Sequence, residues 1–150
     1  MRAPANVRLE RFQQLIERVA FESLSGSTII VEGQKDRESL RRLGITGQIE
    51  CLQSSRQNPI GFVETLGDTK RIIVLTDFDR EGISLAMKLS RTLTAHSHHV
   101  NLVLWKNLRE LTRSEVRSIE ELPKYLERLQ NKTYNPTRKK RALRYSELIL

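Results

Sequence analysis

The sequence has a single cysteine, Cys51, among its 150 residues. This excludes an internal disulfide framework and a zinc site built from several cysteines. Apolar runs are short as well, and none approaches the roughly 18 residues that a membrane span requires. The N-terminal segment, MRAPANVRLERFQQL, has no apolar run behind its basic residue, so a signal peptide is not expected. These absences together predict a cytoplasmic protein with no membrane partner.

Positive charge is in excess and is unevenly distributed. The chain has 26 lysines and arginines against 18 acidic residues, a net charge of +8. Six of the basic residues lie in one acid-free segment near the C-terminus, which leaves a net charge of +2 for the rest of the chain. They are Lys132, Arg138, Lys139, Lys140, Arg141 and Arg144. Such a segment beside a nearly balanced domain indicates either an extension that binds a polyanion or a solvated terminus.

Short β-branched runs alternate with amphipathic segments along most of the chain. This alternation predicts an α/β domain, with a parallel sheet and helices on its faces. The predicted strands are residues 28–31, 48–52, 71–76 and 100–105. The predicted helices are residues 8–21, 36–43 with Asp36 as the N-cap, 59–67, 82–94, 107–111 and 118–130. We expect an N-terminal helix within residues 1–26 that packs on the domain, the domain itself over residues 27–131 with a C-terminal helix, and a basic extension over residues 132–150.

Acidic residues follow two of these strands at the point where each strand ends. Glu32 comes directly after residues 28–31, and Asp77 and Asp79 follow residues 71–76. Sites form at the edge where the C-terminal ends of parallel strands meet. Residues two apart in an extended exit loop point the same way, and neighbouring strands lie about 4.8 Å apart, so the three carboxylates can converge if the two strands are neighbours. Oxygen ligands with no cysteine nearby favour Mg²⁺ or Mn²⁺, ions that often serve phosphoryl transfer.

The two segments that carry these acids resemble a known family. The sequences IIVEG (29–33) and VLTDFDREG (74–82) are closely similar to the two signature motifs of the Toprim domain. That domain is shared by type IA and type II topoisomerases, DnaG-type primases, OLD-family nucleases, RecR proteins and the bacterial nuclease that matures 5S ribosomal RNA. In size the chain looks like the small stand-alone Toprim proteins related to that last nuclease. The resemblance implies a mainly parallel four-stranded sheet flanked by helices.

The resemblance also implies roles for individual residues. Glu32 matches the family's glutamate, the general acid or base that also belongs to the metal-binding acids. Asp77 and Asp79 match the aspartates that hold a divalent metal, and Glu81 matches an additional acid of the type IA topoisomerases. Arg80 is a candidate phosphate contact or a surface salt-bridge partner. Lys35 is close enough to Glu32 along the chain to reach a substrate phosphate, and the basic extension would hold a nucleic acid through counterion release.

The chain has no sign of the clamp domains of a topoisomerase or of the zinc module of a primase, which argues against both activities. The leading hypothesis is a Mg²⁺-dependent endonuclease that acts on nucleic acid, on RNA in preference to DNA. The rival hypothesis is a non-catalytic Toprim scaffold for nucleic acid or a protein. A third hypothesis is a subunit of a larger RNA-processing assembly. Whether the chain has a protein partner or forms a homodimer is left open.

Overall fold

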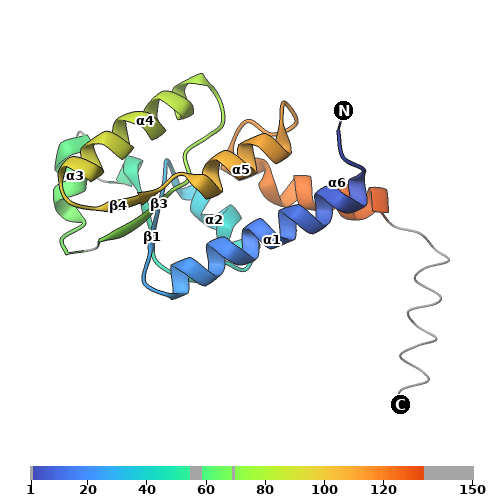
Figure 1. The fold of residues 1–150 in the computed structure, drawn as a ribbon, viewed down its shortest axis with the longest axis horizontal. Helices are drawn as coiled ribbons and strands as arrows, with labels where there is room; N and C mark the ends of the chain where they lie inside the picture. Colours follow the sequence, from blue (N-terminus) through green and yellow to red (C-terminus); the bar gives the residue numbers. More distant parts are fainter. Residues whose placement is uncertain (1, 55–58, 69, 134–150) are drawn as a thin grey trace, which may run out of the picture.

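The centre of the structure is a four-stranded parallel sheet with the strand order β2-β1-β3-β4 (Figure 1). The computed structural model describes residues 2–54, 59–68 and 70–133. The strands are β1 (Thr28–Val31), β2 (Ile49–Cys51), β3 (Arg71–Val74) and β4 (His99–Asn101). The helices are α1 (Ala5–Leu24), α2 (Gln34–Arg42), η1 (Leu52–Ser54), α3 (Pro59–Thr65), α4 (Arg80–Ala95), α5 (Val103–Thr112), η2 (Ile119–Glu121) and α6 (Leu122–Thr133). The predicted fold class is confirmed.

The two central strands lie side by side with their C-terminal ends level. Ile30 of β1 is paired with Val74 of β3, and the N–H of Leu75 donates to the Ile30 carbonyl at 2.9 Å. All four residues of β1 are buried, which is typical of a parallel strand covered on both faces. Whatever follows these two strands is therefore brought to the same edge of the sheet.

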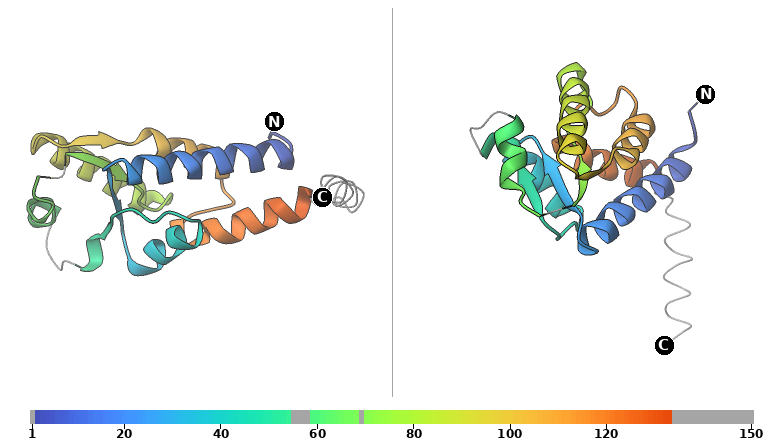
Figure 2. Two further views of the ribbon diagram at one scale, coloured as in Figure 1. Left: turned by 90° about the horizontal axis from the view of Figure 1, so that it is seen from below. Right: turned by 60° about the vertical axis from the view of Figure 1, so that its left-hand side comes forward.

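Helices cover both faces of the sheet (Figure 1). Right-handed crossovers place α2 on one face and α3 and α4 together on the other. On the first face α2 contacts η2 and α6, while α1 contacts α5 and α6. The helices α1 and α6 run antiparallel (Figure 2), and the rings of Phe12 and Tyr125 meet edge to face at 5.4 Å between centroids. In the part of the chain that the structure describes, no helix is long and apolar enough to span a bilayer.

The structure corrects the predicted last strand, residues 100–105. Strand β4 ends at Asn101, and residues from Val103 onward form α5, which extends the predicted helix 107–111 toward the N-terminus. The Oδ1 atom of Asn101 accepts from the N–H of Val103 at 2.9 Å and from that of Leu104 at 3.4 Å, so it satisfies amides that a helix start leaves free. Trp105, which was predicted to end this strand, is instead a buried residue of helix α5.

Several other helix boundaries differ from the predicted ones. Gly33, not Asp36, is the N-cap of α2, and the Asp36 carboxylate accepts from the Gly33 N–H at 3.1 Å from within the first turn. Helix α4 begins at Arg80 instead of residue 82 because Asp79 is its N-cap. The predicted helix 118–130 starts as the short η2, and α1 is longer than residues 8–21. As a result Asp36 lies in the first turn of α2 and Asp79 lies at the start of α4, both at the edge of the sheet.

Candidate metal and nucleic-acid site

Glu32 and Asp77 meet where β1 and β3 end. The Oε2 atom of Glu32 accepts a hydrogen bond from the backbone N–H of Asp77 at 2.7 Å. The Glu32 carbonyl accepts from the N–H of Gln53 at 3.0 Å, which ties the same residue to the segment after β2. Glu32 is therefore fixed between two neighbouring strand ends, with its carboxylate turned toward the segment that carries both aspartates.

The two aspartates are each held by a backbone amide. The Oδ1 atom of Asp77 accepts from the N–H of Ile119 at 3.1 Å, which links the exit of β3 to η2. The Oδ1 atom of Asp79 accepts from the N–H of Gly82 at 2.7 Å and caps α4. Glu81 is exposed in the first turn of α4. Each of the three predicted metal ligands keeps a second carboxylate oxygen beyond the one used by an amide.

Among the described residues, no three acidic, histidine or cysteine side chains are assembled closely enough to hold a metal ion. Glu32 and Asp77 are in contact at the edge of the sheet, whereas the Asp79 carboxylate is turned to the Gly82 N–H at the start of α4. The donor set itself fits Mg²⁺ or Mn²⁺, since all the candidate ligands are carboxylate oxygens.

Like charge is concentrated around Asp77. Its pKa is raised to about 7, first by burial and then by the neighbouring carboxylates of Glu32 and Asp79, against the lowering effect of the Ile119 N–H. Burial and the charge of Asp77 likewise raise the pKa of Asp36 to about 6. A proton on Asp77 therefore relieves a repulsion that a divalent cation would also relieve.

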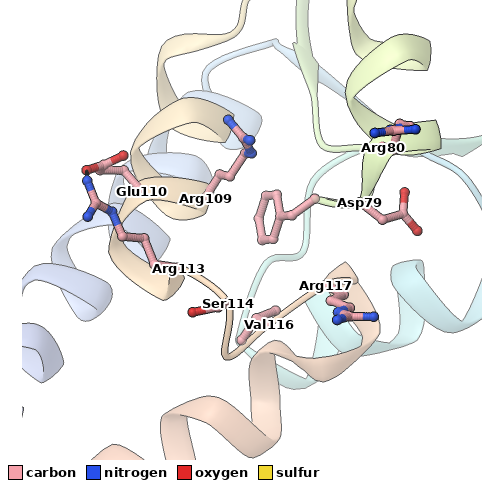
Figure 3. A pocket seen from close by; sticks show the side chains of 9 residues that line it. Asp79, Arg80, Arg109, Glu110, Arg113, Ser114, Val116 and Arg117 are labelled. Carbon is pink, nitrogen blue, oxygen red and sulfur yellow. Dashed lines mark hydrogen bonds and ion pairs between the residues drawn. The ribbon is translucent and has the colours of Figure 1, made fainter.

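Two cavities flank this edge. The acidic cavity, of about 440 Å³, is lined by Glu32, Asp36, Asp77 and Glu120, and within the part of the chain that the structure describes Lys35 is its one basic residue. The arginine groove, of about 460 Å³, lies on the Asp79 side (Figure 3). Its charged residues are Asp79, Arg80, Arg109, Glu110, Arg113 and Arg117.

The predicted nucleic-acid-binding residues are divided between different places. Lys35 lies in the acidic cavity and Arg80 lies in the arginine groove. Lys132 is exposed in the last turn of α6. Arg138, Lys139, Lys140, Arg141 and Arg144 lie outside the described residues. The sequence predicted Asp36 only as a helix N-cap and did not single out Arg109 or Arg117, because these residues come from separate elements and share no motif.

We expect Asp77→Asn to stabilise the protein in EDTA at neutral pH. The folded Asp77 keeps its proton up to about pH 7, whereas an unfolded aspartate loses it near pH 4, so wild-type stability falls as the pH rises through this interval. Asparagine does not titrate, and its amide oxygen still accepts from Ile119. After allowance for solvent screening, the gain in unfolding free energy is about 1–2 kcal/mol at about pH 8 and close to zero at about pH 4.

Urea unfolding of both proteins at these two pH values measures the gain. Asp68→Asn is a suitable control because Asp68 is exposed and precedes β3, at the opposite end of that strand. An equal gain at both pH values would contradict the titration of Asp77 as its cause.

Comparison with known proteins agrees with this geometry. The chain matches the Toprim domain over residues 26–103. It is 36% identical over 127 residues to a UPF0292 protein of Methanosarcina acetivorans, with 84% of this chain and 87% of that protein covered. It is also 36% identical over 114 residues to UPF0292 protein TK1411 of Thermococcus kodakarensis, with 75% and 81% covered.

A solved structure, described as a putative protein from Aquifex aeolicus, matches with a TM-score of 0.60 at 24% identity. The match covers 72% of this chain and 94% of that chain, and at this identity it shows the fold alone. Glu32, Asp77 and Asp79 lie within the matched Toprim segment, whereas Arg109 and Arg117 lie beyond it.

Proposed function

Because the chain belongs to the Toprim domain family, we propose that it is a Mg²⁺-dependent endonuclease that cuts nucleic acid, RNA in preference to DNA. The family domain is one of metal-dependent nucleic-acid processing. The observation that carries the proposal is the contact of Glu32 with the backbone of Asp77, which joins the two motifs at one edge of the sheet. The preference for RNA rests on the similarity in size to the small Toprim proteins related to the 5S ribosomal RNA maturation nuclease. A cytoplasmic location belongs to the same proposal.

In this proposal Asp77 and Asp79 hold the ion and Glu81 is an additional ligand. When bound, the ion would polarise a phosphoryl oxygen and stabilise the charge that develops there. Glu32 takes up or returns a proton at its carboxylate, supported by its fixed position against the Asp77 amide. Lys35, Arg80, Lys132 and the basic extension would attract the phosphates of the strand.

One observation favours a second candidate, a non-catalytic scaffold that binds nucleic acid or a protein. Glu32, Asp77 and Asp79 each accept from a backbone N–H, so all three also serve the local structure. A scaffold would need only these structural contacts and would have no use for the metal. The endonuclease should bind the metal and cleave nucleic acid, whereas the scaffold should do neither, so these two measurements separate the candidates.

The test compares wild type with the Asp77→Asn, Asp79→Asn double variant. We expect calorimetry to detect Mg²⁺ or Mn²⁺ binding to wild type that weakens by at least about tenfold in the variant, since even partners outside the first ligand layer cost that much. Cleavage of matched RNA and DNA oligonucleotides should fall by at least about 100-fold, and RNA should be the faster substrate in wild type. Asp68→Asn should leave both properties unchanged. Metal binding without cleavage, or cleavage that survives in the double variant, would contradict the proposal.

A further inference from the structure

The arginine groove is built from three elements that are distant in the sequence. Phe78, Asp79 and Arg80 come from the exit of β3 and the start of α4, Arg109 and Arg113 come from α5, and Arg117 comes from the segment before η2. Figure 3 shows Arg80 and Arg109 on one side of the groove and Arg117 on the other, with Asp79 between Arg80 and Arg117. Of the acids at the edge of the sheet, Asp79 lines this groove, whereas Glu32 and Asp77 line the acidic cavity.

The positive charge of the groove is only partly neutralised by the protein. Arg113 pairs with Glu110, and this pair lies at the end away from Asp79 (Figure 3). The side chains of Arg80 and Arg117 make no ion pair or hydrogen bond within residues 2–54, 59–68 and 70–133. The Arg109 guanidinium lies over the Trp105 ring, 5.9 Å from its centroid, a contact that leaves its charge in place. Three exposed guanidinium groups thus face solvent in one concavity.

Backbone contacts position these arginines relative to the acidic edge. The N–H of Phe78 donates to the Arg117 carbonyl at 2.8 Å, and Glu121 accepts from the Arg117 N–H at 2.6 Å. Trp105, which lies under Arg109, donates from its indole nitrogen to the Thr76 carbonyl at 2.8 Å. These contacts hold the Arg117 backbone and the Trp105 ring beside Arg109 against the exit of β3, the segment that carries Asp77 and Asp79.

We propose that the arginine groove binds the sugar–phosphate backbone of a single nucleic-acid strand beside the scissile phosphate. Guanidinium groups bind phosphate oxygens through paired hydrogen bonds. A volume of about 460 Å³ is within the range of small-molecule sites and is enough for a short stretch of one backbone. The acidic cavity is lined by four carboxylates and, among the described residues, one lysine, so before a cation binds it attracts a phosphate chain less than the arginine groove does. The strand therefore approaches the edge from the α5 side. This assignment rests on the proposed function only in naming the bound strand as the substrate.

The test measures binding in EDTA, where no metal-dependent cleavage occurs. Fluorescence anisotropy would follow labelled single strands of about 12 nucleotides, oligo(rU) and oligo(dT), with wild type and with Arg109→Gln, Arg117→Gln. The control, Arg42→Gln, Arg91→Gln, also removes two exposed charges, but near the ends of α2 and α4 remote from the acidic edge. We expect the groove variant to bind at least about tenfold more weakly and its salt dependence, as log K against log[salt], to become shallower by about 1.4, or 0.7 per lost contact. The control variant should stay close to wild type.

Each outcome separates the groove from the nuclease proposal. Equal weakening in both double variants would overturn the groove assignment, because net charge alone would then explain the binding. No binding by wild type would also overturn it, because the groove would then hold no strand. If the groove variant cleaves its substrate with an unchanged KM, the groove assignment would be wrong and the nuclease proposal would be supported. Binding that depends on Arg109 and Arg117 without any cleavage would support the groove and contradict the nuclease. Arg117→Gln alone, which removes no described side-chain contact, serves if the double variant unfolds.

Discussion

Replacement of Glu32 by glutamine is expected to lower the rate of metal-dependent cleavage by about 10²–10⁴-fold, the range that a general acid or base contributes. The glutamine amide oxygen can still accept from the Asp77 N–H, as the Glu32 carboxylate does at 2.7 Å. The strand ends should therefore stay in place. What the substitution removes is a group that can take up and release a proton.

Single-turnover cleavage with saturating Mg²⁺ measures this loss, and calorimetry measures the metal affinity of the same variant. We expect the affinity to fall less than in Asp77→Asn, Asp79→Asn, because Glu32→Gln removes one carboxylate charge from the edge whereas the double variant removes two. Glu38→Gln is the matched control, since Glu38 is exposed on α2 outside both cavities. A Glu32→Gln variant that binds the metal and cleaves at the wild-type rate would show that Glu32 does not transfer the proton.

Gly82→Ala is expected to destabilise the fold by about 2–4 kcal/mol, as overpacked buried sites do. A Cβ atom at Gly82 would lie 2.0 Å from the Asp77 carbonyl oxygen and 2.5 Å from its carbonyl carbon. Both are backbone atoms, so no side-chain rotation relieves the clash. Any shift would also strain the Gly82 N–H bond to Asp79 and the bond from Thr76 Oγ1 to the Gly82 carbonyl. The edge of the sheet should lose its metal affinity together with its stability.

Urea unfolding measures the loss, and Ser84→Ala provides the control on the same helix. Ser84 is exposed, and alanine is the better helix former, so that variant should gain a few tenths of a kcal/mol. The same propensity would favour alanine at position 82 if space allowed. A Gly82→Ala protein as stable as wild type would mean that the Asp77 backbone can move away at little cost.

The contrast between β3 and β4 shows how far local pattern predicted the fold. The apolar residues of β1 and β3 are isoleucines and valines, all of them buried, and β-branched side chains of this kind pack well on a covered sheet. The run 100–105 has similar apolarity, but Leu104, Trp105 and Leu108 fit a helical stripe equally well. The Asn101 side chain favours the helix, because it accepts from the first amides of α5. The apolar content of residues 100–105 does not by itself distinguish a strand from a helix.

The alternation of strands and helices, the two apolar strands and the acids that follow them can be read from the chain alone. These features depend on residue types next to one another in the chain, so propensity and spacing specify them. Three features are visible only in the folded protein: Ile119 holds Asp77 across 42 positions, Asp36 lines the same cavity as Asp77, and arginines from α5 and the segment before η2 lie in one groove with Asp79. Contacts between distant segments follow from how the helices pack on the sheet, and no local pattern encodes that packing.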